Sequence, residues 1–235
     1  MSADNLKYYN SNANLKSAGQ TIQFSEDNIK EYLKCAEDPV YFINNFVKIS
    51  HPIEGLLSFK LYPFQEDCIK QFQDYRFNIV LKARQLGLST ATSSFILWMM
   101  LFHREKTILT VATKLSTAAN MVKKVKTMYK NLPDWMKIAK IQGDNKSTLE
   151  LNNGSWVKAA STTGDSGRSE ALSLLVVDEA FAPFGFAVEV AAQVADKGPG
   201  RENAATVRVD DVAEYQSGED LGTGLCHRAS QCSGG

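Results

Sequence analysis

Two segments that lie far apart in the sequence hold the residue types that phosphate chemistry requires. The first reads Lys82-Ala83-Arg84-Gln85-Leu86-Gly87-Leu88-Ser89-Thr90, and the second ends in Asp178-Glu179. A glycine-containing loop can bind phosphate through backbone N–H groups, and its hydroxyl can ligate Mg²⁺. A carboxylate pair can hold the same ion and accept a proton from an attacking water. Together the segments predict a site that binds and hydrolyses ATP.

The first segment differs from a standard phosphate-binding loop in the position of its cation. That loop reads Gly-x4-Gly-Lys-[Ser/Thr] and lies between a strand and a helix. Gly87 and Ser89 stand at the second glycine and the hydroxyl positions. Lys82 stands where the first glycine would be, and Leu88 stands where the lysine would be. The positive charge must therefore come from elsewhere in the segment.

We predict that Lys82, at the end of a strand, supplies this charge, with Arg84 as a second candidate. The backbone N–H groups of residues 84–89 would cradle the phosphates, and Ser89, in preference to Thr90, would supply the hydroxyl ligand for Mg²⁺. Taken alone, this segment fits a structural loop equally well.

The second segment, Leu174-Leu175-Val176-Val177-Asp178-Glu179, is a buried-strand pattern that ends in two acids. We predict that Asp178 binds Mg²⁺ through water and that Glu179 takes the proton of the attacking water. A strand that simply ends in surface acids is the alternative. Both segments occur in the expected order, each at the carboxyl end of a predicted strand, and this favours an ATPase.

Three further features carry weaker signals. The Gln65 amide could contact adenine, although an exposed helix glutamine is the alternative. Arg168 could sense the γ-phosphate or touch DNA, or be an ordinary salt-bridged loop residue. Cys226-His227 and Cys232 give only a slight indication of zinc.

The elements around these residues predict a doubly wound α/β domain with a mostly parallel sheet. We expect helices to start after Ser25, at Asp38-Pro39 and at Pro63, and to span 89–101 and 116–129. The expected strands are 77–81, 107–112, a hairpin of 147–151 and 155–159, and 172–177.

Four regions follow from this pattern: a flexible arm (1–24), a helical lead-in (25–60), a partial P-loop ATPase core of the ASCE type (61–180) that is incomplete at its C-terminus, and an atypical tail (181–235). Residues 1–180 hold 18 Lys and 4 Arg, whereas 181–235 hold 1 Lys and 3 Arg and no Ile, Met or Trp. The tail is therefore either a disordered acidic segment or not the native continuation, and we favour the second interpretation.

Composition narrows the class of protein. No apolar run approaches the ~20 residues of a membrane span, and no signal-peptide core opens the chain, so we expect a cytoplasmic protein. Cys35 and Cys68 are expected to be reduced, buried thiols. Ten basic and three acidic residues lie between Arg104 and Lys146. This charge fits either a solvated helix face or a surface for nucleic-acid phosphate.

At these residues the chain resembles the large terminase subunit of tailed bacteriophages, and most closely its T-even-type branch. The resemblance is carried by Asp38-Pro39-Val40-Tyr41-Phe42-Ile43, Leu61-Tyr62-Pro63-Phe64-Gln65, Arg84-Gln85-Leu86-Gly87, Leu149-Glu150-Leu151-Asn152-Asn153-Gly154-Ser155 and Val177-Asp178-Glu179-Ala180. Leu88 departs from the loop lysine of many relatives, although some members place a lysine where Lys82 stands. After Ala180 we find no resemblance, and the family's nuclease domain is not recognisable.

The resemblance implies an ATP-driven motor that packages double-stranded DNA into proheads in the host cytoplasm. Its partners would be DNA, the portal protein and the small terminase subunit, in a homo-oligomeric ring on the portal and without a membrane. Glu179 and Arg84 would be catalytic, Ser89 and Asp178 would hold Mg²⁺, and ATP would contact Gln65, Lys82, Ala83, Arg84, Gln85, Leu86, Gly87, Leu88, Ser89 and Thr90. The alternatives are a helicase-like or remodelling ATPase and a truncated, non-catalytic terminase fragment.

Overall fold

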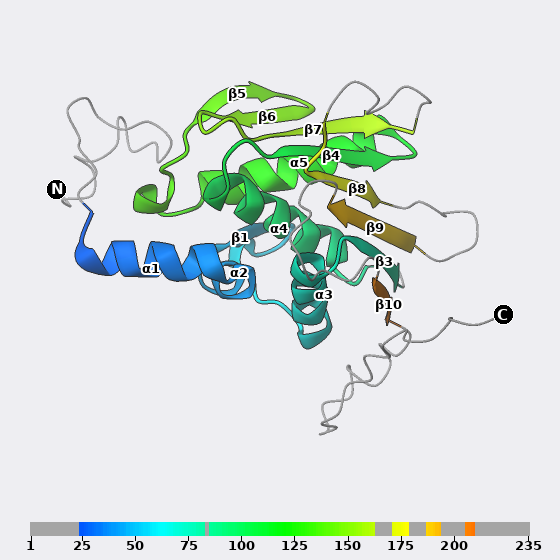
Figure 1. The fold of residues 1–235 in the computed structure, drawn as a ribbon, viewed down its shortest axis with the longest axis horizontal. Helices are drawn as coiled ribbons and strands as arrows, with labels where there is room; N and C mark the ends of the chain where they lie inside the picture. The colour runs from blue at the N-terminus through cyan, green and yellow to red at the C-terminus, as the bar shows by residue number, and fades with distance from the viewer. Residues whose placement is uncertain (1–23, 83–84, 163–170, 179–186, 194–204, 210–235) are drawn as a thin grey trace.

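The computed structural model describes residues 24–82, 85–162, 171–178, 187–193 and 205–209 (Figure 1). Its helices are α1 (Glu26–Glu37), α2 (Pro39–Phe46), α3 (Pro63–Asp74), α4 (Leu88–Phe102), α5 (Leu115–Lys130) and a short 3-10 helix, Asp134–Met136. Its strands are β1 (Lys48–His51), β2 (Gly55–Ser58), β3 (Phe77–Lys82), β4 (Thr107–Ala112), β5 (Ile141–Asn145), β6 (Thr148–Leu151), β7 (Trp156–Ser161), β8 (Leu174–Asp178), β9 (Ala187–Gln193) and β10 (Ala205–Val209).

The helix starts follow the capping signals of the sequence. The Ser25 side chain accepts a hydrogen bond from the Asn28 N–H, which caps α1. The Asp38 carboxylate accepts the N–H groups of Val40 and Tyr41 ahead of Pro39 at the first turn of α2. The three predicted starts are therefore confirmed, including α3 at Pro63.

Eight strands form one mixed sheet in the order β10-β3-β9-β8-β4-β7-β6-β5. The pairs β10–β3, β4–β8 and β4–β7 are parallel, whereas β3–β9, β8–β9, β6–β7 and β5–β6 are antiparallel. The expectation of a mostly parallel sheet is therefore wrong. The β5–β6–β7 meander contributes two antiparallel pairs, and β9 adds two more because it inserts in the reverse direction between β3 and β8.

The loop of the first segment begins directly after β3 and ends at α4, as predicted. Helix α4 is apolar on nearly all sides and lies within the core, where it packs on α2, α3 and α5. Helix α5 lies against β4, β6 and β7 (Figure 1). The α4 N-terminus and the carboxyl ends of β3 and β8 are thereby held by buried neighbours, which fixes the frame of the site.

The lead-in contains a feature that the sequence did not predict. Strands β1 and β2 form a separate two-stranded antiparallel sheet, and the backbone N–H of Phe59, which follows β2, bonds to the Val47 carbonyl. Cys35 and Cys68 are free and buried, as expected, and burial raises the pKa of the Cys35 thiol to about 12. No helix in the described residues is long and apolar enough to cross a membrane.

Candidate nucleotide site

The described part of the loop between β3 and α4 contains two left-handed residues. Gln85 and Gly87 both adopt left-handed conformations, with φ of 66° and 70°. Gly87 is the N-cap of α4, and its carbonyl accepts the N–H groups of Thr90 and Ala91. Left-handed residues turn successive N–H groups toward one side, where the positive end of the helix dipole adds to their effect.

Leu88 occupies the position of the usual loop lysine and is buried. It is 1 % exposed and belongs to the hydrophobic core. A lysine at this position would therefore place its stem in the core of the domain. Because leucine carries no charge, the site must take its positive charge from other residues.

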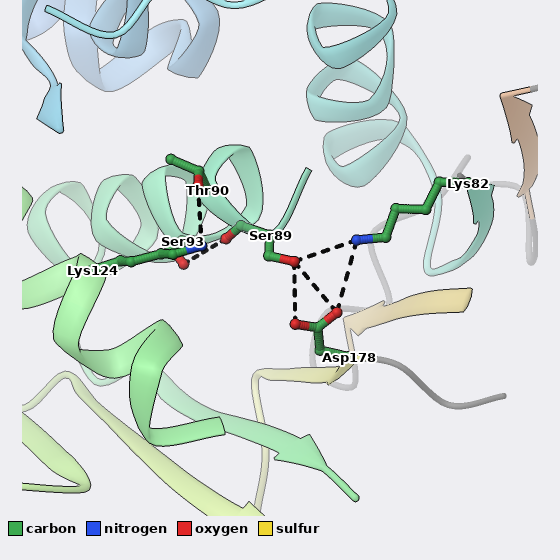
Figure 2. A network of polar contacts seen from close by, with 6 residues as sticks. All are labelled: Lys82, Ser89, Thr90, Ser93, Lys124 and Asp178. Atoms are coloured by element: carbon green, nitrogen blue, oxygen red, sulfur yellow. Dashed lines mark hydrogen bonds and ion pairs between the residues drawn. The ribbon is translucent and has the colours of Figure 1, made fainter. Parts of the chain in front are cut away.

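Lys82, Ser89 and Asp178 form a compact network beside the loop (Figure 2). The Lys82 ammonium lies 3.3 Å from the Ser89 hydroxyl oxygen and 3.8 Å from Asp178 Oδ1. The Ser89 hydroxyl lies 3.4 and 3.2 Å from the two carboxylate oxygens of Asp178. The Lys82 and Asp178 side chains are 8 % and 6 % exposed, so their attraction acts where water screens it little.

The sheet explains why these distant residues meet. Lys82 ends β3, Asp178 ends β8 and β9 lies between the two strands. Two strand spacings separate β3 from β8 by about 10 Å. The long lysine side chain crosses this gap, while Ser89 reaches the carboxylate from the first turn of α4.

Thr90 faces a different neighbour from Ser89. Its hydroxyl oxygen lies 3.1 Å from the ammonium of Lys124, which projects from α5. Figure 2 shows Lys82 and Lys124 approaching the start of α4 from opposite sides. The structure thus brings Ser89 to Asp178 and places Thr90 beside a second lysine.

A pocket of about 260 Å³ opens at this point. Its lining combines loop residues with two lysines, namely Lys82, Gln85, Leu86, Gly87, Leu88, Ser89, Thr90 and Lys124. The pocket therefore joins N–H groups at a helix N-terminus to two ammonium groups, which suits a polyanionic ligand.

Ser89 and Asp178 fit a magnesium ion. Neighbouring ligands of an octahedral Mg²⁺ with bonds near 2.1 Å lie about 3 Å apart. The Ser89 hydroxyl and the Asp178 oxygens are 3.2 and 3.4 Å apart. Across the described residues, no group of three or more His, Cys, Asp or Glu could hold a metal. Phosphate oxygens and water would have to complete the shell, as Mg²⁺ commonly allows.

Gln65 is buried at the base of the loop and is 1 % exposed. Its Nε2 donates to the Leu86 carbonyl at 2.8 Å, and its Oε1 accepts the Tyr62 N–H at 3.1 Å. The amide therefore links the start of α3 to the loop. Contact with adenine would use the remaining N–H and lone pair of this amide and stays a prediction.

Several predicted residues lie outside the described part of the chain. These are Ala83, Arg84, Arg168, Glu179 and the group Cys226, His227 and Cys232. The same holds for residues 1–23 of the expected arm and for most of the expected tail, of which β9 and β10 are described.

The basic stretch from Arg104 to Lys146 is partly used within the fold. Lys126 pairs with Asp144 at 2.7 Å and also donates to the Asn145 carbonyl. Lys130 lies 3.9 Å from Asp144, and Lys137 lies 3.5 Å from Asp134. A surface for DNA phosphate therefore stays a prediction. Lys126, Lys130 and Lys137 support it weakly, because each pairs with a carboxylate of the same domain.

Lys124 is the site residue that sequence reasoning missed. The charge pattern marked the whole stretch but did not separate this lysine from its neighbours. The helical spacing could have identified Lys124. It lies three residues after Met121 and four before Met128, which are both buried, so it shares their side of the helix. That spacing places Lys124 at the border of the buried face of α5.

Comparisons with known proteins give one family match and one similar solved structure. Residues 79–203 match the family described as terminase large subunit, T4-like-virus type, N-terminal. Among solved structures, the chain is similar to the HK97 bacteriophage large terminase, with a TM-score of 0.49 and 19% identity. That similarity covers 74% of this chain and 37% of the HK97 chain, so the present chain spans well under half of that protein's length.

The family match continues beyond Ala180, so our expectation that the resemblance stops there is wrong about its extent. The matched residues include most of β3 and all of α4, β8 and β9, which are the elements that carry or separate the two halves of the candidate site. Because the match covers more than half of the sequence, the chain belongs to the family of T4-like-virus-type terminase large subunits and carries their N-terminal part.

Proposed function

We propose that this chain is the ATP-binding part of a DNA-packaging motor, with a P-loop ATPase core of the ASCE type. In the complete protein, Mg-ATP hydrolysis would drive double-stranded DNA into a prohead in the host cytoplasm. The portal protein, the small terminase subunit and further copies of the large subunit in a ring would be its partners. Family membership favours this function over a helicase-like or remodelling ATPase.

The convergence of Lys82, Ser89 and Asp178 at one pocket is the observation that carries the proposal. A structural loop has no need of a lysine, a hydroxyl and a carboxylate gathered from two separate strands and a helix start. Nucleotide binding requires this set, because a polyphosphate must be neutralised and its magnesium ion must be held.

Each residue has a distinct part in the proposed site. Ser89 and Asp178 would hold Mg²⁺, which supplies charge neutralisation at the β- and γ-phosphate oxygens. With the Asp178 carboxylate engaged in this way, the Lys82 ammonium would turn to the phosphates. Glu179 would orient and deprotonate the attacking water, and Arg84 would add charge at the γ-phosphate.

The magnesium dependence of ATP binding tests the metal assignment. We expect Mg²⁺ to strengthen ATP binding by the wild-type chain by at least about tenfold, or about 1.4 kcal/mol. Ser89→Ala should abolish this gain because it removes one of the two ligands. Thr90→Ala removes a hydroxyl one residue later and should retain the gain, since Thr90 faces Lys124 rather than Asp178.

The measurement is the Kd of ATP with Mg²⁺ and with EDTA for the three proteins, by calorimetric titration. A gain that survives in Ser89→Ala, or one that is lost only in Thr90→Ala, would contradict the assignment. Thermal melts of each variant confirm that the comparison concerns folded protein.

A further inference from the structure

A second lysine, which comes from outside the loop, reaches the phosphate pocket. Lys124 lies on α5, and its ammonium lies 3.1 Å from the Thr90 hydroxyl oxygen. It lines the pocket of about 260 Å³ together with Lys82 and the loop. Figure 2 shows it on the side of Ser89 opposite to Lys82.

The position of Lys124 is fixed by the packing of its helix. Met121, Val122, Val125 and Met128 are buried on the inner face of α5. Helix α5 packs directly on α4, where the Ser94 hydroxyl lies 3.5 Å from the Met128 sulfur. The backbone that carries Lys124 is therefore held against the helix whose N-terminus forms the pocket.

A polyphosphate bound in the pocket would need positive charge, and Lys124 can supply part of it. The usual loop lysine is replaced by Leu88, which is buried in the core. Lys82 approaches from the β3 side, where it lies beside Asp178. A triphosphate bound along the α4 N-terminus would present oxygens to both walls, and the α5 wall contributes a cation only through Lys124 among the pocket-lining residues described.

We propose that Lys124 binds the polyphosphate of the nucleotide and, with Lys82, replaces the missing loop lysine. This inference rests on the proposed function, because it assigns a further phosphate contact to the same site. The hydrogen bond to Thr90 orients the Lys124 ammonium toward the pocket. Phosphate oxygens would replace Thr90 as the acceptor when the nucleotide binds. Lys124 thus neutralises charge from the side of the pocket that Lys82 does not reach.

The test compares ligands with and without a polyphosphate. Binding of Mg-ATP, AMP and inorganic tripolyphosphate is measured for wild type, Lys124→Ala, Lys124→Arg and Lys123→Ala. The last variant is the matched control, because Lys123 is exposed on the same helix and does not line the pocket. Thermal melts accompany each protein, and Lys124→Gln replaces Lys124→Ala if the alanine variant does not fold.

We expect Lys124→Ala to weaken Mg-ATP and tripolyphosphate binding by tenfold or more, and AMP binding by less than threefold. Lys124→Arg should retain binding within about threefold of wild type because it keeps the charge. Lys123→Ala should match wild type throughout. A merely structural role would weaken AMP and Mg-ATP in the same proportion and would overturn the inference.

The outcomes separate this inference from the proposed function. If wild type binds Mg-ATP and Lys124→Ala equals Lys123→Ala, the Lys124 assignment alone is overturned. If wild type binds neither Mg-ATP nor tripolyphosphate, the proposed function fails and the assignment falls with it.

Discussion

At the scale of single residues, the proposed site takes its cation from Lys82 and not from the usual loop position. The position of the usual loop lysine holds Leu88, whose side chain lies in the core, whereas Lys82 reaches the same region from the end of β3. Its ammonium lies within 3.8 Å of Asp178 and 3.3 Å of Ser89. The loop therefore has a complete set of polar groups without the usual lysine.

A lysine restored at position 88 tests this interpretation. In a Lys82→Ala background, Leu88→Lys should not recover Mg-ATP binding, because the new side chain starts inside the core. It should also lower the free energy of unfolding by about 3 kcal/mol or more through lost packing and a buried charge.

Denaturant unfolding and ATP titration give the two readouts for this double variant. Leu115→Lys is the stability control, since Leu115 is 49 % exposed at the start of α5 and should tolerate the change. Recovered ATP binding in the double variant would show that position 88 can face the phosphates and would contradict the relocated cation.

At the scale of elements, the loop conformation is supported by α3. The Gln65 amide bonds to the Leu86 carbonyl, and a Cβ built at Gly87 would lie 3.0 Å from Gln65 Nε2. Helix α3 therefore buttresses the loop from behind while Gly87 turns the chain into α4. This gives Gln65 a supporting role that is visible without any bound nucleotide.

Gly87→Ala should lower the free energy of unfolding by about 1–2 kcal/mol, because φ of 70° is left-handed and disfavours a side chain. ATP binding should weaken as well, since the loop N–H groups would shift. Removing the Gln65 side chain in the same protein should relieve the contact but not the backbone cost.

Gly143→Ala is the control for this experiment. Its Cβ would also lie 3.0 Å from a side-chain tip, Glu150 Oε2, and 3.3 Å from Glu150 Cβ, but Gly143 is not in a left-handed conformation. Denaturant unfolding should show the smaller loss for Gly143→Ala. Equal losses at the two glycines would mean that the left-handed turn carries no cost and would contradict the described loop.

At the scale of the whole molecule, local signals in the sequence predicted the elements well and their arrangement less well. The caps at Ser25 and Asp38, the turn Asn152-Asn153-Gly154 and the strand ending in Asp178 are local features, and the structure contains each of them. Sheet order depends on pairing between distant strands. The reversed insertion of β9 therefore had no local signal, and the sheet is mixed rather than mostly parallel.

The residues of the candidate site divide in the same way, into those with a local sequence signal and those placed by contacts between distant elements. Lys82, Ser89 and Asp178 were predicted because each lies at the end of a strand or the start of a helix, where a motif defines it. Lys124 was missed because its place in the pocket comes from packing of α5 on α4. The direction of Leu88 was likewise set by burial, which a loop motif does not contain.

The expected tail, residues 181–235, overlaps the family match. The family match extends to residue 203, and β9 lies in the sheet between the two halves of the site. That residues 181–235 are not the native continuation stays a prediction, which the encoding DNA in all reading frames would test. The similarity to the HK97 large terminase covers 37% of that chain.

The central claim is that Lys82 is the phosphate-binding cation of a working nucleotide site. Calorimetric titration of Mg-ATP into wild type, Lys82→Ala and Lys123→Ala tests it most directly. We predict one binding event for wild type and Lys123→Ala, and at least about tenfold weaker binding for Lys82→Ala, as expected for a lost charged hydrogen bond of about 1.5–3 kcal/mol. No binding by folded wild type, or equal affinities for the two lysine variants, would contradict the claim.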